Sequence, residues 1–348
     1  MESLRWLYQN VWRPIEKALP AGTLEVIVSP DGALAFVSFA ALTDGLGPFV
    51  GERYRISYVS TGRDLVGIPG SDAGTGGLLV LANPDFGAPA LDTGSGKERA
   101  LSGAPGEEPV LRGLSFRPLP GAEAEGRLLQ RRAFAMGFPG VELYTGREAT
   151  ETRLRRAKGA KVLHLATHGF HLPAEPGPAS LESATKVAGV VDSGLGHPML
   201  RSGLLLAGAR ASLERRNMGK RVVSENDGIL TAHEVATLDL RGTELVVISA
   251  CDSGMGELWT GEGVLGLRRG FVQAGVRNLL LTLWPIEDGE IASMMLDFHS
   301  TSQRTGEARQ ALAEVQRAWL SRLRAERGPA VAARVAGPLI LSYQASAK

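Results

Sequence analysis

From residue 77 onward, short apolar runs alternate with segments of helical spacing. The apolar runs have the length and composition of buried strands; they are 78–82, 141–144, 162–167, 245–250 and 278–283. The helical segments are 123–136, 148–157, 231–238, 263–274, 289–302 and a last one whose face carries Leu312, Val315, Trp319 and Leu323. Repeated β–α units predict a mainly parallel sheet with helices on both faces, and 338–343 is a candidate last strand.

The first 76 residues have a different pattern and are interpreted as a small α+β segment ahead of the main domain at 77–348. Helical spacing at 4–17 ends at Pro20. Two apolar runs, at 24–28 and 34–39, flank Pro30-Asp-Gly32, a turn signal that predicts a β-hairpin. A third strand is expected at 54–60.

Two of the candidate strands lead to a chemically reactive side chain. The run Val162-Leu-His-Leu-Ala-Thr-His-Gly169 ends in His168 and Gly169, and the run Leu245-Val-Val-Ile-Ser-Ala-Cys251 ends in a thiol. Parallel strands end at the same edge of a sheet, where open α/β sheets build their sites, so we expect the thiol and the imidazole side by side. Histidine is a suitable base for producing thiolate near neutral pH, and this pairing indicates a cysteine peptidase.

Less specific interpretations apply to some of these residues. Cys251, taken alone, fits an inert buried thiol, and His164 lies inside its run and is interpreted as a core histidine. The segment Gly261-Glu-Gly-Val-Leu-Gly266 matches a dinucleotide-binding pattern. That pattern requires its first glycine in the turn directly after a strand, whereas here the cysteine-containing segment intervenes. We therefore expect no nucleotide cofactor.

Charge and cysteine content exclude several classes of function. With 38 basic and 37 acidic side chains, the chain has no net field that favours nucleic acid or an anionic membrane. No apolar stretch approaches the roughly 20 residues of a membrane span, and the N-terminus lacks the apolar core of a signal peptide. One cysteine cannot form an internal disulfide, which suits a reducing cytoplasm. No histidine has zinc-site spacing, so we expect no metal and no other cofactor.

The stretch 171–228 interrupts the alternation directly after His168. Long loops that follow a catalytic strand commonly shape or cover a site. We expect part of this stretch to be mobile or to cover the cleft until a partner or substrate binds. A surface insertion without function is the alternative for 174–197.

Several segments, in their order along the chain, resemble the CHAT family of caspase-like, separase-related cysteine peptidases, and the resemblance covers nearly the whole sequence. They are His164-Leu-Ala-Thr-His-Gly169, Leu200-Arg-Ser-Gly-Leu-Leu-Leu-Ala-Gly208, Asp227-Gly-Ile-Leu-Thr-Ala-His-Glu-Val235, Ser249-Ala-Cys-Asp-Ser-Gly254, Gly261-Glu-Gly-Val-Leu-Gly-Leu-Arg-Arg-Gly270 and Leu283-Trp-Pro-Ile-Glu-Asp288. The segment Pro338-Leu-Ile-Leu-Ser-Tyr343 departs from the family, because it lacks an aromatic-rich final strand. The resemblance implies a caspase-type sheet, a Cys251–His168 dyad and endopeptidase activity on a protein substrate. Family members often carry tetratricopeptide repeats, so such a repeat domain or another regulatory partner is expected, although no repeat of that period occurs here.

The remaining site residues are predicted around this dyad. The backbone N–H groups of Gly169 and Cys251 are expected to form an oxyanion hole. Ser249 lies two residues before Cys251, and the strand period therefore places it on the same face, near the first specificity pocket. The separase-like pattern implies that Trp284 and Asp288 line that pocket.

Asp252 and Glu287 are further acidic candidates for the pocket, and together with Asp288 they would favour a basic P1 residue; a pocket dominated by Trp284 would favour an apolar one. In the alternative interpretation, Asp288 only caps the helix that begins near Gly289.

Two other classes of function stay open at this point. One is a scaffold or peptide-binding module that keeps the fold without turnover. The other is a cysteine transferase or hydrolase that acts on a non-protein substrate.

Overall fold

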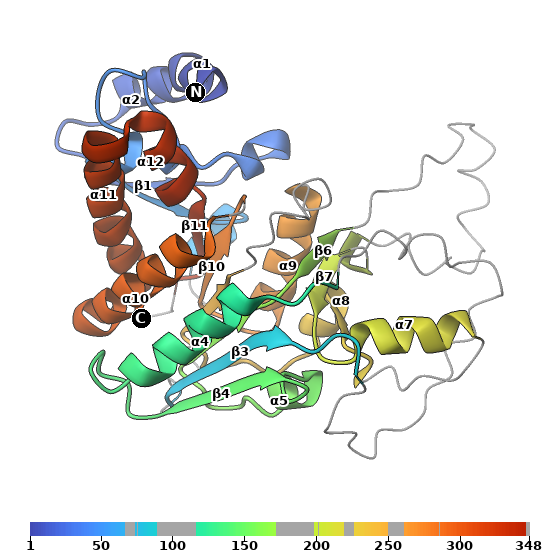
Figure 1. Cartoon of the computed structure of the whole chain (residues 1–348). Coiled ribbons are helices and arrows are strands. Elements are labelled where there is room, and N and C mark those ends of the chain that lie inside the picture. Colours follow the sequence, from blue (N-terminus) through green and yellow to red (C-terminus); the bar gives the residue numbers. More distant parts are fainter. Residues whose placement is uncertain are drawn as a thin grey trace, which may run out of the picture.

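An eight-stranded sheet forms the centre of the protein in the computed structural model (Figure 1). The structure describes residues 1–66, 74, 76–88, 116–171, 198–200, 202–218, 226–249, 261–284 and 286–345. The strand order is β1-β2-β11-β10-β9-β5-β3-β4. The strands are β1 (Glu25–Val28), β2 (Arg55–Tyr58), β3 (Leu78–Pro84), β4 (Val141–Gly146), β5 (Val162–Ala166), β9 (Leu245–Ile248), β10 (Asn278–Thr282) and β11 (Leu339–Tyr343).

The sheet is mainly parallel, as predicted from the β–α alternation. β3, β4, β5, β9 and β10 run in one direction, and β11 pairs antiparallel with β10. β2 continues in the direction of β11, with Ser342 opposite Tyr58, and β1 pairs in parallel with β2. The candidate last strand at 338–343 is therefore confirmed, and it lies inside the sheet rather than at its edge.

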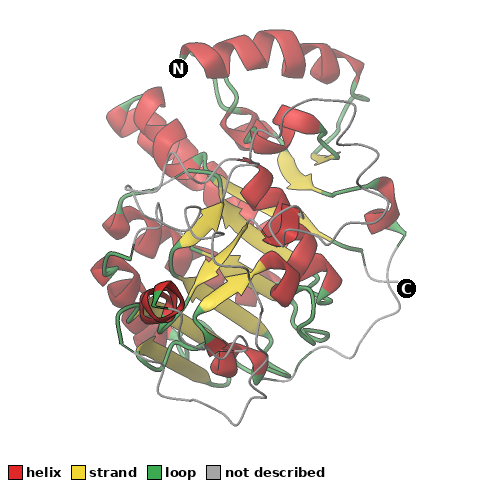
Figure 2. Cartoon of the chain, turned by 90° about the vertical axis from the view of Figure 1, so that its right-hand side faces the viewer, coloured by secondary structure: helices red, strands yellow, loops and turns green. Residues whose placement is uncertain are grey.

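Helices cover both faces of the sheet, which Figure 2 shows as a central layer of strands. One face packs Val80, Val247 and Leu280 against α4 (Pro120–Arg132), α10 (Asp288–Thr305), α11 (Ala308–Arg327) and α12 (Pro329–Ala336). The other face packs Leu81, Leu165 and Ile248 against α5 (Glu151–Arg155), α8 (Ala232–Val235) and α9 (Gly261–Gln273). Apolar residues on both sides of each central strand explain why these runs are continuous in sequence rather than alternating.

The predicted N-terminal hairpin is wrong. Residues 34–39 lie mostly in two short 3-10 helices, η2 (Gly32–Phe36) and η3 (Phe39–Ala41). Asp31 caps η2 by accepting a 2.8 Å hydrogen bond from the Gly32 N–H, so the chain coils after the turn instead of extending. β1 pairs with β2, the strand predicted at 54–60, and both extend the main sheet.

A continuous helical segment precedes β1, as the sequence predicted. It consists of α1 (Glu2–Leu7), a π-helical turn (Tyr8–Trp12) and α2 (Arg13–Ala18), and its Trp12 is fully buried against Phe39 and Tyr54. Two shorter helices, α3 (Val50–Arg53) and η4 (Gly62–Leu65), flank β2.

A second, three-stranded antiparallel sheet follows β5. It has the order β6-β7-β8, with β6 (Gly169–His171), β7 (Ser202–Leu205) and β8 (Ile229–Thr231). The short helix η6 (Pro198–Leu200) precedes β7, and α7 (Ala209–Asn217) follows it. Part of the excursion at 171–228 thus folds onto the sheet's carboxyl edge, whereas 172–197 and 219–225, on which the predicted covering role depends, lie outside the described residues.

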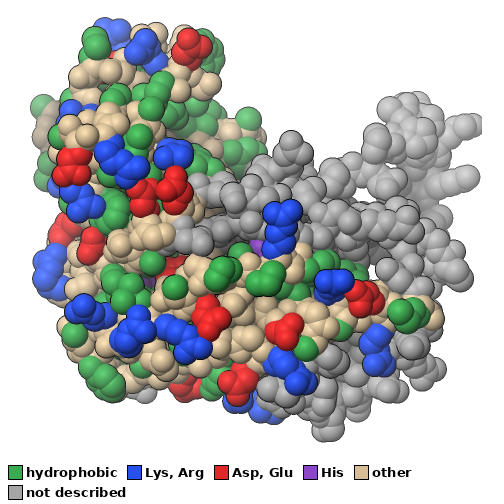
Figure 3. Space-filling view, in the orientation of Figure 1, with side chains coloured by type: hydrophobic (Ala, Val, Ile, Leu, Met, Phe, Trp, Pro, Cys, Tyr) green, Lys and Arg blue, Asp and Glu red, His purple; other side chains and the backbone are tan. Residues whose placement is uncertain are grey.

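Positive and negative side chains are interspersed on the described surface in the view of Figure 3. This distribution agrees with the nearly equal counts of 38 basic and 37 acidic residues. Among the described helices, none combines the length and apolarity that crossing a membrane requires.

Candidate active site

The strands that lead to His168 and toward Cys251 are neighbours in the sheet. β5 pairs in parallel with β9, with Leu165 opposite Ile248, and the Ser249 N–H donates to the Leu165 carbonyl at 3.0 Å. The predicted adjacency of the two strand ends is therefore confirmed. Cys251 and Asp252 themselves lie outside the described residues, so their positions remain predictions.

His168 is buried at the carboxyl end of β5, with 1% of its surface exposed. Its Nε2 lies 2.8 Å from the carbonyl oxygen of Arg117, and its ring stacks against Phe86 with centroids 5.2 Å apart. Because a carbonyl only accepts hydrogen bonds, this contact assigns a proton to Nε2. In the neutral imidazole, the lone pair is then on Nδ1, the nitrogen that can act as a base.

The end of β3 holds the segment that carries the Arg117 carbonyl. The side-chain oxygen of Asn83 accepts a hydrogen bond from the Leu119 N–H at 2.6 Å, and its amide donates to Glu123 at 2.9 Å. Asn83 has a φ of 46°, in the left-handed region that asparagine tolerates better than most residues. This local bend at the strand end therefore fixes the start of α4 above His168.

Gly169 is buried and begins β6, where it pairs with Leu204 of β7. The carbonyl of His168 accepts a hydrogen bond from the Leu205 N–H at 2.9 Å. The small sheet thus holds the backbone on either side of the imidazole. The predicted role of the Gly169 N–H in an oxyanion hole remains a prediction.

Ser249 is 3% exposed, and its hydroxyl donates to Oε2 of Glu125 at 3.1 Å. The other oxygen of this carboxylate, Oε1, lies 3.0 Å from His164 Nε2, an ion-pair distance at which the ring N–H does not point straight at the oxygen. His164 Nδ1 in turn lies 3.1 Å from Nε2 of His299 on α10. Ser249 therefore faces a buried polar chain under α4, and its role in a specificity pocket remains a prediction.

Sequence reasoning identified His164 correctly as a core histidine but missed Glu125 and His299. His299 follows Met295 by four positions on the apolar face of α10, a spacing that could have indicated burial. Burial lowers the pKa of His299 well below its ordinary value, and charge on His164 lowers it further. His299 is therefore neutral at physiological pH.

Two of the other predicted pocket residues, Trp284 and Glu287, follow β10 and contact α12. Trp284 is half-buried, and its indole N–H donates to the Arg334 carbonyl at 3.0 Å. Glu287 is exposed and lies 3.3 Å from the Arg334 guanidinium. Helix α10 begins at Asp288, with Glu287 at its N-cap position. The predicted roles of the Asp288 side chain, in the pocket or as a cap, remain predictions.

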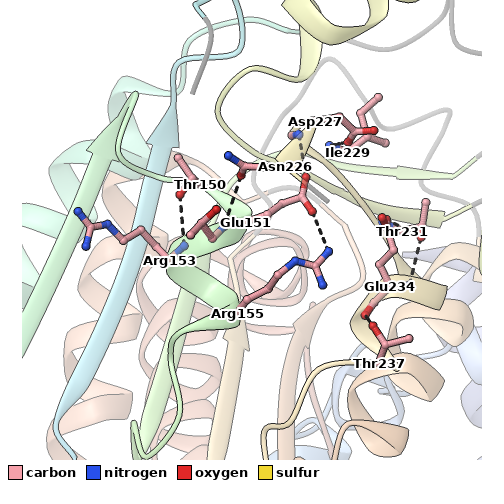
Figure 4. A network of polar contacts seen from close by, with 12 residues as sticks. Thr150, Glu151, Arg153, Arg155, Asn226, Asp227, Ile229, Thr231, Glu234 and Thr237 are labelled. Carbon is pink, nitrogen blue, oxygen red and sulfur yellow. Dashed lines mark hydrogen bonds and ion pairs between the residues drawn. The ribbon is translucent and has the colours of Figure 1, made fainter. Parts of the chain in front are cut away.

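A second buried polar cluster joins α5 to the small sheet (Figure 4). Glu151 is completely buried; it accepts from the Gly228 N–H at 2.8 Å and pairs with Arg155 at 3.1 Å. Asp227 accepts from the Ile229 N–H at 2.8 Å and forms an ion pair with Arg216. Within the described part of the chain, no group of three or more His, Cys, Asp or Glu side chains is arranged to hold a metal ion.

The fold and the strand-end histidine define a caspase-like, protease-related α/β domain. The chain belongs to the CHAT-domain family, because the sequence model of that family matches residues 1–334. A search of curated proteins gave no significant match.

Proposed function

We propose that this protein is a cysteine endopeptidase of the CHAT family that acts on a protein substrate through Cys251 and His168. The observation that carries the proposal is the geometry of His168: the imidazole lies at the carboxyl end of β5, next to the strand that leads to Cys251, with its Nε2 at 2.8 Å from a backbone carbonyl. This contact selects the tautomer that a general base requires, and the family membership supports the assignment. The single cysteine favours the cytoplasm as its compartment.

In the proposed reaction, Nδ1 of His168 takes the proton of the Cys251 thiol as sulfur attacks the scissile carbonyl. The Arg117 carbonyl then stabilises the imidazolium, since Nε2–H already points at it. The imidazolium donates its Nδ1 proton to the departing amine, the C–N bond breaks, and an acyl-enzyme remains. Water attacks that thioester with His168 as base, and release of the acid regenerates the thiol. The N–H groups of Gly169 and Cys251 are the proposed donors to the oxyanion.

The proposed specificity is for a basic P1 residue, with an apolar P1 residue as the alternative. Asp252 and Asp288 carry this proposal, because the Glu287 carboxylate already lies beside the Arg334 guanidinium and has part of its charge balanced. An unpaired, desolvated carboxylate is costly and a matching cation relieves that cost. Trp284, half-buried beside α12, would supply the apolar wall.

Turnover of a fluorogenic peptide library tests the proposal. We expect cleavage that disappears in both Cys251→Ala and His168→Ala, while His233→Ala, a matched change at an exposed histidine on α8, keeps it. Peptides that differ only at P1 then test specificity: a preference for leucine over arginine that Asp288→Asn leaves unchanged would contradict the acidic pocket. Binding of peptides without cleavage by the wild type would favour the scaffold function, and turnover of non-peptide esters or amides alone would favour a different hydrolase.

A further inference from the structure

Four buried polar side chains from four separate elements form a continuous chain beneath the carboxyl edge of the sheet. Ser249 follows β9, Glu125 lies on α4, His164 lies in β5 and His299 lies on α10. Successive distances along the chain are 3.1, 3.0 and 3.1 Å, and each member is at most 3% exposed. Burying this many polar groups in an otherwise apolar core is costly unless they are paired.

Glu125 lies between Ser249 and His164 in this chain and contacts both of them. A carboxylate accepts and does not donate, so it takes the Ser249 O–H on one oxygen and faces His164 Nε2–H on the other. His164 Nδ1 lies within hydrogen-bond distance, 3.1 Å, of Nε2 of the neutral His299. The hydrogen bond to Glu125 therefore connects Ser249 to a buried side chain of helix α4.

Helix α4 and the segment directly before it contact His168 and Ser249, the residues that follow β5 and β9. The segment before the helix supplies the Arg117 carbonyl to His168. Within the helix, Glu125 accepts a hydrogen bond from Ser249, which lies two residues before Cys251 in the sequence. The same helix packs on β3, β4, β5 and α10, which fixes its position.

We propose that Glu125 is a positioning residue that acts through Ser249 to fix the direction in which the chain leaves β9 toward the nucleophile. Ser249 is then an anchor for the cysteine-bearing segment and not a wall of the specificity pocket. This inference rests on the proposed peptidase function, but it can be tested separately, because the alkylation of a cysteine requires no turnover.

The first measurement is peptide cleavage by Ser249→Ala, Ser249→Thr and Glu125→Gln in the full chain. We expect Ser249→Ala to lower kcat about 10-fold with KM within about 2-fold, since small misplacements of reacting groups cost rate rather than binding. Ser249→Thr keeps the hydroxyl and should retain most of the activity. Glu125→Gln should lower kcat by a similar factor. The double variant with Ser249→Ala should have a kcat only slightly lower than either single variant, because both substitutions remove the same hydrogen bond.

The second measurement is the rate of Cys251 alkylation by iodoacetamide as a function of pH. A thiol held beside an imidazole forms thiolate below its ordinary pKa of about 8.5, so displacing it moves the midpoint of the profile upward. We expect this upward movement in Ser249→Ala and Glu125→Gln and not in Ser249→Thr. A purely structural role would lower the thermal midpoint without moving the alkylation profile.

Ser57→Ala is the matched control. Ser57 is a fully buried serine of β2 whose hydroxyl has no hydrogen-bond partner in the described part of the chain, so its loss should change neither measurement. A change of KM or of P1 preference in Ser249→Ala at unchanged kcat would assign Ser249 to the pocket and overturn the proposal. An alkylation profile identical in all variants would also overturn the proposal. This second test applies even if the wild type cleaves no peptide, because alkylation requires no turnover.

Discussion

Replacing Asp227 with asparagine should make the protein relatively more stable near neutral pH than in mild acid. Asp227 is 4% exposed, and burial raises its pKa to about 6, although the neighbouring Arg216 limits the rise. The folded state therefore holds a proton that the unfolded chain, with an aspartate pKa of 3.8, releases more readily. Stability from this group is fully present below pH 3.8 and is lost as the pH rises through 6.

The magnitude follows from the two pKa values. Their difference, 6 minus 3.8, is 2.2, which corresponds to about 3 kcal/mol at roughly 1.4 kcal/mol per pH unit. About 2 kcal/mol of this falls between roughly pH 4.5 and 7.5. Asparagine carries no charge and can still accept from the Ile229 N–H through its side-chain oxygen, while Arg216 is exposed enough to remain hydrated. Burial raises the pKa of the neighbouring Glu151, and the charge of Asp227 raises it further. Removing that charge lowers the Glu151 pKa, which changes the difference between variant and wild type in the same direction.

Urea unfolding at a series of pH values provides the assay. The free energy of unfolding of Asp227→Asn minus that of the wild type should rise by about 2 kcal/mol from pH 4.5 to 7.5. Asp239→Asn is the control: this exposed carboxylate pairs with Arg241 and Lys158, which hold its pKa below the ordinary value, so it stays charged throughout the range and its difference should stay flat. A flat or falling difference for Asp227→Asn would refute the reasoning.

Three further predictions follow from other buried groups. Burial keeps His299 neutral in the folded state, so His299→Gln should remove a loss of stability that the wild type shows as pH falls below roughly 6.5; equal pH dependence in both proteins would contradict this. Arg268 is 3% exposed, its Nε and Nη2 have no acceptor in the described part of the chain, and burial lowers its pKa to about 10. Arg268→Met should therefore raise the free energy of unfolding by about 1 kcal/mol in urea titrations. A decrease in the free energy of unfolding would contradict this prediction. A Cβ on Gly203 would lie 2.3 Å from the Leu230 carbonyl oxygen and 2.7 Å from the Phe170 ring. Gly203→Ala should therefore lower the free energy of unfolding by about 2–3 kcal/mol and lower the thermal midpoint. An unchanged midpoint would show that the small sheet can shift to accommodate the methyl group.

The sequence predicted the central sheet well because its strands are buried on both faces. β3, β5, β9 and β10 are continuous apolar runs whose expected bounds agree with the structure to within about two residues. The N-terminal hairpin was predicted wrongly because apolar residues at 34–39 fit a strand as well as they fit two buried 3-10 turns. Whether this segment forms a strand or 3-10 turns depends on the pairing of β1 with β2, which is a contact between positions distant in the sequence.

The sequence predicts the site residues that directly follow a strand, but it does not predict those whose place depends on tertiary packing. The position of His168 came from its place after an apolar run, and the structure confirms a buried imidazole there. The carbonyl of Arg117 could not have been found, since any residue supplies a carbonyl and its place depends on the bend at Asn83. Glu125 was equally hidden, because a glutamate on an amphipathic helix ordinarily faces solvent.

The place of β11 has a consequence for how the chain folds during synthesis. β1 and β2 leave the ribosome before the other described strands. In the described sheet they connect to β10 only through β11, which is translated after every other described strand. Pairing of such distant segments is slow, and until it occurs β2 and β10 each present an open edge. The nascent protein should therefore depend on a chaperone to protect these edges until β11 has been translated.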